Sequence, residues 1–183
     1  MSKLFYIMGA SGVGKDSLIN YCREQVNGSL PILFAHRYIT RPITAIGENH
    51  IFLSPREFKL RQQQGLFALQ WESHELHYGI GIEIDSWLNK GFSVVLNGSR
   101  EYLSNALQKY PQLQPILITA DPENIKARLN CRGRENEADI ARRITRNEEL
   151  NKQHKDIIEV ENNGKIEEAA NNLLNFLLAT GSV

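Results

Sequence analysis

Short apolar runs alternate with helical patterns along the first two thirds of the chain. Four runs, at residues 4–8, 31–35, 92–96 and 115–119, are largely apolar and are bounded by glycine, proline or polar residues. Such runs are typical of parallel strands that are buried on both faces of a sheet. Helical patterns occupy residues 15–25, 55–64, 84–89 and 99–109, and we expect the C-terminal third to be largely helical. The alternation predicts an α/β fold, a parallel sheet flanked by helices.

Two stretches interrupt this alternation. Residues 36–83 are rich in His, Arg, Gly and short strand-like runs, and residues 128–147 are rich in Arg. Insertions of this kind in a compact α/β core are often subdomains that cover a substrate. We therefore expect one domain with a core of residues 1–35, 84–127 and 148–183, a substrate-covering subdomain of residues 36–83 and a lid of residues 128–147.

Composition narrows the function classes. The 183 residues include 21 basic and 21 acidic residues, so the formal net charge is zero, which disfavours a nucleic-acid binder. No run of about 18 apolar residues occurs, which argues against a membrane span. The two cysteines are far apart and indicate a reducing compartment. We expect a cytoplasmic protein with no membrane or nucleic-acid partner; the oligomeric state stays open, with a dimer as one option.

The strongest motif is a glycine-rich loop between the first predicted strand and the first predicted helix. The loop and the residues that follow it read G-A-S-G-V-G-K-D-S, which matches G-x-x-x-x-G-K in the required context. Backbone N–H groups of such a loop bind phosphate, and the lysine reaches the β and γ phosphates of a nucleotide. The nucleotide site predicted here comprises Gly9, Ala10, Ser11, Gly12, Val13, Gly14, Lys15, Asp16 and Ser17, with Lys15 also catalytic.

The metal-binding part of this motif is altered. A Ser or Thr normally follows the lysine and ligates Mg²⁺ together with a strand Asp. Here Asp16 follows the lysine, Ser17 supplies a hydroxyl one residue later, and the strand at residues 92–96 leads into Asn97. Our hypothesis is that Asp16, with Ser17, takes over part of the Mg²⁺ site through a water. The alternative is that Asp16 is only a favourable acid in the first helical turn.

Arginines dominate the expected lid. Residues 128–146 contain six arginines and three acids, a local net charge of +3. A guanidinium can contact two oxygens of a transferring phosphoryl group at once. We predict that Arg132 and Arg143 are catalytic and that Arg128 contacts the nucleotide. For Arg142 and Arg146 a solvated helix face with ion pairs is an equal alternative.

Further motifs accompany the loop and the Arg-Gly pair of the lid: R-Y-I-T-R-P at 37–42, G-E-N-H at 47–50, F-A-L-Q-W at 67–71, Y-G at 78–79 and V-E-N-N at 160–163. In this order they resemble the guanylate kinase family over nearly the whole chain. The resemblance implies a P-loop nucleoside-monophosphate-kinase-like fold, ATP and Mg²⁺ as cofactors, and a small phosphorylated acceptor bound by residues 36–83. It assigns the acceptor phosphate to Arg41 and Tyr78, puts Arg37 and His50 at neighbouring positions, and places Asn162 near the adenine.

The residues that would read the acceptor differ from the family pattern. Guanylate kinases meet guanine with two carboxylates, and the corresponding positions here hold Gln70 and Asn97. An amide loses the charge-assisted part of such hydrogen bonds, so guanine is disfavoured. Within the family, the chain resembles the ribose 1,5-bisphosphate phosphokinases of phosphonate utilisation, which implies ATP-dependent formation of 5-phosphoribosyl 1-diphosphate. A guanylate-type nucleoside monophosphate kinase and a non-catalytic scaffold on the same fold stay as alternatives.

Overall fold

A five-stranded parallel sheet forms the centre of the protein. The structure is a computed structural model, and it describes residues 2–26, 28, 30–43, 49–132, 145 and 157–179. The strand order is β2-β7-β1-β8-β9, and every neighbouring pair is parallel. The strands are β1 (Leu4–Gly9), β2 (Ile32–Phe34), β7 (Ser93–Asn97), β8 (Gln114–Thr119) and β9 (Ile158–Glu161). The predicted α/β fold is therefore confirmed.

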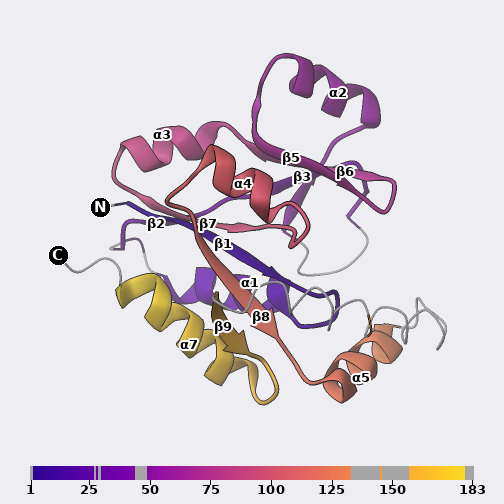
Figure 1. Cartoon of the computed structure of the whole chain (residues 1–183), viewed down its shortest axis with the longest axis vertical. Helices are drawn as coiled ribbons and strands as arrows, with labels where there is room; N and C mark the ends of the chain where they lie inside the picture. Colours follow the sequence, from indigo (N-terminus) through magenta and orange to yellow (C-terminus); the bar gives the residue numbers. More distant parts are fainter. Residues whose placement is uncertain are drawn as a thin grey trace.

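Helices cover both faces of this sheet, and the alternation of side chains in β1 shows how (Figure 1). Leu4, Tyr6 and Met8 pack in one cluster with residues of α3 (Glu83–Asn89) and α4 (Leu103–Lys109). Phe5 and Ile7 point to the other face and pack with α1 (Lys15–Gln25) and α7 (Ile166–Ala179). Because successive side chains of a strand point to opposite faces, this one strand joins two hydrophobic cores.

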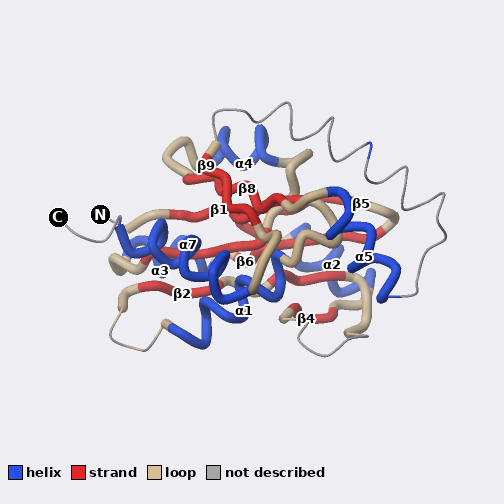
Figure 2. Tube along the Cα trace, turned by 90° about the horizontal axis from the view of Figure 1, so that it is seen from below, coloured by secondary structure: helices blue, strands red, loops and turns tan. Residues whose placement is uncertain are grey.

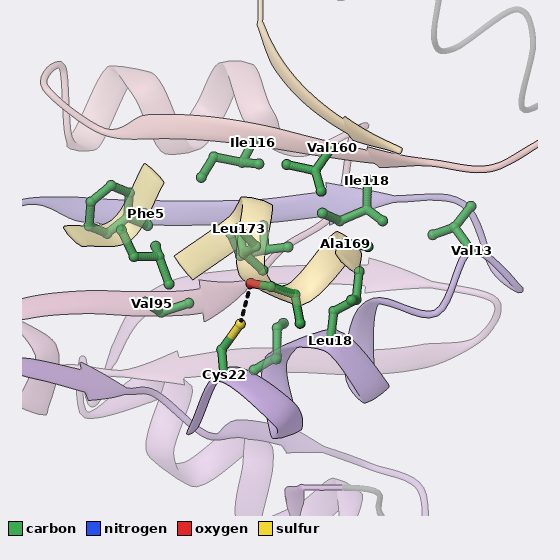
Figure 3. Close-up of a cluster of buried hydrophobic side chains, with 14 of the residues drawn as sticks. Phe5, Val13, Leu18, Cys22, Val95, Ile116, Ile118, Val160, Ala169 and Leu173 are labelled. Atoms are coloured by element: carbon green, nitrogen blue, oxygen red, sulfur yellow. Dashed lines mark hydrogen bonds between the residues drawn. The ribbon is translucent and has the colours of Figure 1, made fainter. Parts of the chain in front are cut away.

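Small and branched side chains make up most of the core under α1 and α7. Figure 3 shows Leu18 and Cys22 of α1 against Ala169 and Leu173 of α7, below the side chains of the central strands. The Sγ of Cys22 lies 3.7 Å from the carbonyl oxygen of Ala170, so the two helices pack closely. Figure 2 shows the sheet from the side of α1 and α7.

A second, four-stranded sheet lies within residues 36–83. Its order is β4-β3-β6-β5, with β3 parallel to β4 and antiparallel to β6. The strands are β3 (Arg37–Ile39), β4 (His50–Phe52), β5 (Phe67–Ser73) and β6 (Leu76–Gly81), and α2 (Pro55–Gln63) covers the outer face. Phe58 of α2 stacks on Phe67 with a centroid distance of 4.5 Å. Leu69 and Ile80 instead join the core cluster under α3 and α4, which fastens the second sheet to the first.

Two expectations about elements need correction. The helix expected at 99–109 begins only at Leu103, because residues 99–102 form a turn. The C-terminal third was expected to be largely helical, but β9 adds a parallel strand at the edge of the central sheet. Only Val160 of this strand is buried, and its two glutamates are exposed, so it lacks the apolar run that marks the other strands.

The expected lid lies mostly outside the described residues. Helix α5 (Pro122–Arg132) contains the first residues of the expected lid, 128–132. Of residues 133–147, only Thr145 is described, so Arg143 lies outside the described residues. Within the described part of the chain, no helix combines the length and the apolar character that crossing a bilayer requires.

Candidate active site

The glycine-rich loop connects the end of β1 to the start of α1, as the sequence predicts. Gly12 and Gly14 both have φ of +90°, a conformation that glycine adopts without strain. Gly14 is the residue before the helix and provides no side-chain cap, so the first N–H groups of α1 are left to bind an anion. A Cβ atom at Gly9 would collide with the backbone carbonyl of Ile118 on β8, so this position requires glycine as well.

Lys15 lies over its own loop. Its Nζ donates hydrogen bonds to the carbonyl oxygens of Gly9 at 2.7 Å and Ala10 at 3.0 Å. The ammonium is thereby held beside the backbone N–H groups of the loop, where the phosphates of a nucleotide would lie. The predicted nucleotide site is one continuous structural unit.

Arg128 and Asn162 hold this loop from outside. The carbonyl oxygen of Val13 accepts hydrogen bonds from Nδ2 of Asn162 at 2.7 Å and from the guanidinium of Arg128 at 3.3 Å. Arg128 also donates to the carbonyl of Asn162 at 2.8 Å, and the backbone N–H of Asn162 donates to Thr119 at 2.8 Å. Sequence reasoning assigned both side chains to the nucleotide and missed that they fix the loop, a contact between segments far apart in the chain.

Asp16 connects the loop to both sheets. Its Oδ1 accepts hydrogen bonds from Nδ2 of Asn97 at 2.7 Å and from the guanidinium of Arg37 at 2.9 Å. Asn97 ends β7 opposite Ile7 of β1, and Arg37 begins β3 of the second sheet. The side chain of Asp16 is 55% exposed and that of Arg37 is 20% exposed, so this ion pair lies at the edge of the site. The structure therefore brings a predicted metal ligand together with two residues assigned to the acceptor.

The turn after Asn97 is fixed by a buried tyrosine. The hydroxyl of Tyr6 donates to the carbonyl oxygen of Ser99 at 2.8 Å and accepts from the N–H of Ser99 at 2.9 Å. Gly98 lies against the ring of Tyr6, and a Cβ atom there would overlap it. Burial raises the pKa of Tyr6 well above its usual range, so the hydroxyl stays protonated and able to donate.

Several residues assigned to the acceptor share one face of the second sheet. In β3, Arg37 is paired with His50 of β4 and with Ile80 of β6. Ile39 follows Arg37 by two residues and is paired with Tyr78 of β6. Residues that pair directly, or that are two apart in a strand, point to the same face. Arg37, His50 and Tyr78 therefore face the same side, toward the central sheet.

Tyr78 belongs to a row of aromatic rings. It stacks on Trp71 with a centroid distance of 5.5 Å and an interplanar angle of 3°, and Trp71 stacks on Tyr102 at 5.6 Å. Tyr102 lies just before α4, so the row connects the second sheet to the core. Gln70 directly precedes Trp71 and pairs with Gly79, so its side chain leaves the sheet on the opposite face from Tyr78.

His50 also contacts the chain near Arg41. The residue is 5% exposed, and its Nε2 lies 2.9 Å from the carbonyl oxygen of Arg41. This contact fixes the backbone that carries the Arg41 side chain. His50 therefore has a structural part in the site, which its position in the sequence did not reveal.

The family model of guanylate kinase matches residues 1–180. The chain belongs to the guanylate kinase family. The crystal structure of guanylate kinase from Anaplasma phagocytophilum superposes on it with a TM-score of 0.75, covering 98% of this chain and 86% of that one at 17% sequence identity. The fold of the guanylate kinase family, expected from the motifs, is thus confirmed by sequence and by structure.

Other proteins are much more similar to this chain in sequence. Ribose 1,5-bisphosphate phosphokinase PhnN of Desulfomicrobium baculatum is 49% identical over 98% of this chain and 96% of its own length. The protein of the same name from Pectobacterium parmentieri is 50% identical over 91% of this chain and 89% of its own. That from Thiobacillus denitrificans is 56% identical over 79% of this chain and 76% of its own.

Proposed function

We propose that this protein is a ribose 1,5-bisphosphate phosphokinase, which transfers the γ-phosphoryl group of ATP to ribose 1,5-bisphosphate and yields 5-phosphoribosyl 1-diphosphate and ADP. The observation that carries the proposal is the identity of 49% with a phosphokinase of that name over 98% of this chain. The complete phosphate-binding loop supports an enzyme rather than a scaffold, because a binding module has no need of Lys15 over a phosphate site.

The acceptor side of the site favours a phosphorylated sugar over a nucleotide. Gln70 and Asn97 are amides where guanylate kinases carry carboxylates, and a neutral hydrogen bond contributes about 1 kcal/mol against roughly 1.5–3 kcal/mol for a charged one. Arg37 adds a cation on the same face of the second sheet as Tyr78. Ribose 1,5-bisphosphate has no base that a carboxylate could recognise, and it carries one more phosphate than GMP. It therefore fits a site in which amides replace the carboxylates and Arg37 adds a positive charge.

The reaction needs charge neutralisation more than proton transfer. The second pKa of a phosphate monoester is near 6, so the acceptor phosphate is largely a dianionic nucleophile at neutral pH and needs no general base. In the proposed mechanism Lys15 and the N–H groups at the start of α1 bind the β and γ phosphates of ATP. Arg41 and Tyr78, with Arg37, His50 and Asn97 around them, orient the acceptor for in-line attack. Gln70 is left out of this set, because it lies on the opposite face of the second sheet from Tyr78.

The residues present fit a divalent cation. Asp16 supplies an exposed carboxylate next to Lys15, and hard cations such as Mg²⁺ prefer oxygen ligands. Asp16 and Ser17 would hold the ion together with the nucleotide phosphates, and Mg²⁺ would there neutralise charge on the transferred phosphoryl group. We include Arg132 and Arg143 in the proposed catalytic set on the sequence argument alone.

A parallel assay tests the proposal. The enzyme is supplied with ATP and Mg²⁺ and with either ribose 1,5-bisphosphate or GMP, and ADP release and the phosphorylated product are measured. We expect a higher kcat/KM for the bisphosphate, with 5-phosphoribosyl 1-diphosphate as product. A higher value for GMP contradicts the proposal in favour of a nucleoside monophosphate kinase, and turnover of neither substrate indicates a scaffold.

A further inference from the structure

Asp16 and Asn97 occupy the two places where P-loop enzymes usually hold their metal ion. In those enzymes a neutral hydroxyl follows the loop lysine and an acid comes from a strand. In this chain the acid follows the lysine, and the strand β7 ends in a neutral amide. The two positions therefore carry one negative charge in both arrangements, but here the charge lies at the start of α1 and not at the end of β7.

The contact between the two side chains shows that the replacements depend on each other. Nδ2 of Asn97 donates to Oδ1 of Asp16 at 2.7 Å. An aspartate at position 97 would place a second carboxylate oxygen against the first, and like charges at such a distance repel strongly. Asp16 thus requires a neutral donor at position 97, and an amide of the same size as aspartate supplies it.

Burial fixes the orientation of the Asn97 amide. Asn97 is 6% exposed, and its Oδ1 is buried without a hydrogen-bond partner among the described residues. Rotating the amide would turn Oδ1 toward the carboxylate of Asp16 and lose the bond, so the orientation with Nδ2 toward Asp16 is the favourable one. A buried acceptor without a partner costs about 1–3 kcal/mol. The hydrogen bond from Nδ2 to Asp16 offsets part of this cost.

The carboxylate is left open on one side. Both donors to this carboxylate, Asn97 and Arg37, bind Oδ1, and within the described part of the chain Oδ2 accepts no hydrogen bond. Carboxylates that bind metals are usually held by hydrogen bonds in this way, with the second oxygen directed at the ion.

We propose that Asp16 and Asn97 form an exchanged metal-site pair, in which Asp16 provides the charge and Asn97 is the positioning residue that orients its carboxylate toward the cation. This inference rests on the proposed kinase function, because it takes the cation to be bound together with a nucleotide. It gives Asn97 a role on the nucleotide side of the site, beyond its assignment to the acceptor.

Mn²⁺ binding to the enzyme–ADP complex tests the pair without turnover and without any acceptor. Free Mn²⁺ is measured by electron paramagnetic resonance for the wild type, Asp16→Ser, Asn97→Asp and the double variant. We expect Asp16→Ser to weaken Mn²⁺ binding about 10- to 100-fold and the double variant to recover most of this loss, because it restores the usual arrangement of hydroxyl and acid. A double variant that binds Mn²⁺ no better than Asp16→Ser overturns the proposal.

Two further variants keep the test decisive if the double variant does not fold. Asp16→Asn preserves the shape of the side chain, and Asn97→Ser replaces the oriented amide with a shorter hydroxyl group. Each should weaken Mn²⁺ binding about tenfold or more. Metal-free ADP should bind at least as tightly to Asp16→Asn, since a negative charge beside the phosphates is gone. Unchanged Mn²⁺ affinity in Asp16→Asn overturns the proposal.

The matched control is Asn172→Asp, which adds a carboxylate at an exposed position of α7. It should leave Mn²⁺ binding unchanged. Because no acceptor is present, a wrong choice of acceptor affects the parallel kinase assay but not this measurement. Loss of the kinase proposal and loss of the exchanged pair are thereby distinguishable.

Discussion

At the scale of single residues, buried side chains position the backbone around the site. The Tyr6 hydroxyl both donates to and accepts from Ser99, and Nε2 of His50 contacts the carbonyl oxygen of Arg41. Neither contact involves a substrate, but each fixes a segment that carries a residue of the proposed site. Positioning therefore depends on polar atoms of buried side chains as well as on the residues of the proposed site.

Tyr6→Phe tests whether the Tyr6 hydroxyl fixes the turn after β7. The change leaves the N–H and C=O groups of Ser99 without their partner, and we expect a loss of about 1–3 kcal/mol in the free energy of unfolding. Urea denaturation measures it. Tyr21→Phe is the control, since no hydrogen bond of the Tyr21 hydroxyl occurs among the described residues; it should change stability by less than about 0.5 kcal/mol. Equal effects of the two variants would contradict the role of Tyr6.

The residues of the proposed site were accessible to sequence reasoning to different degrees. Lys15 and the glycines stand in a local motif whose geometry follows from a strand, a loop and a helix. The contact between Asp16 and Asn97 joins positions 81 residues apart, so spacing could not predict it. The face on which Gln70 lies depends on strand register, which the sequence of one strand does not determine.

At the scale of elements, the loop is supported by α5 and by the residue that follows β9. Arg128 and Asn162 converge on the carbonyl oxygen of Val13, and a Cβ atom at Gly14 would lie 2.5 Å from Nδ2 of Asn162. The strand that the sequence did not predict is thus followed directly by a residue of the proposed nucleotide site. At the edge of the sheet only Val160 of β9 is buried, so the strand can carry two exposed glutamates. It therefore lacks the apolar run by which the other strands are predicted.

Asn162→Ala tests the support of the loop. Removing the amide leaves the carbonyl of Val13 with the longer bond to Arg128 only, among the described residues, and frees space beside Gly14. We expect the affinity for ATP to fall about tenfold, which corresponds to 1.4 kcal/mol, with a smaller effect on the affinity for the acceptor. Calorimetric titration measures both. Asn172→Ala serves as a surface control, and a loss confined to acceptor affinity would contradict the expectation.

At the scale of the whole molecule, the two hydrophobic cores share the strand β1 and should unfold together. Cys22 of α1 is fully buried against α7, and burial raises the pKa of its thiol to about 12 from an ordinary value of 9.0. The folded protein therefore favours the neutral thiol. Its contribution to stability is complete below pH 9 and declines as the pH rises above 9, where the thiolate forms in the unfolded chain.

Thiol labelling measures this global stability. Iodoacetamide at pH 8 should modify the exposed Cys131 rapidly and Cys22 only through unfolding. Leu173→Ala, which opens a cavity beside Cys22, should cost about 2–5 kcal/mol and accelerate labelling of Cys22 about 30-fold or more. Rapid labelling of Cys22 in the unmodified native protein would show instead that α1 and α7 separate locally.

The aromatic row gives the protein an optical signal of its own. The chain has two tryptophans, and Trp71 lies in ring contact with Tyr78, the residue proposed to hold the acceptor phosphate. Replacing Trp87 in α3 with Phe would leave Trp71 as the single indole emitter. Its fluorescence would then report directly on events at the acceptor side, so that binding of a sugar phosphate can be followed in real time without a label.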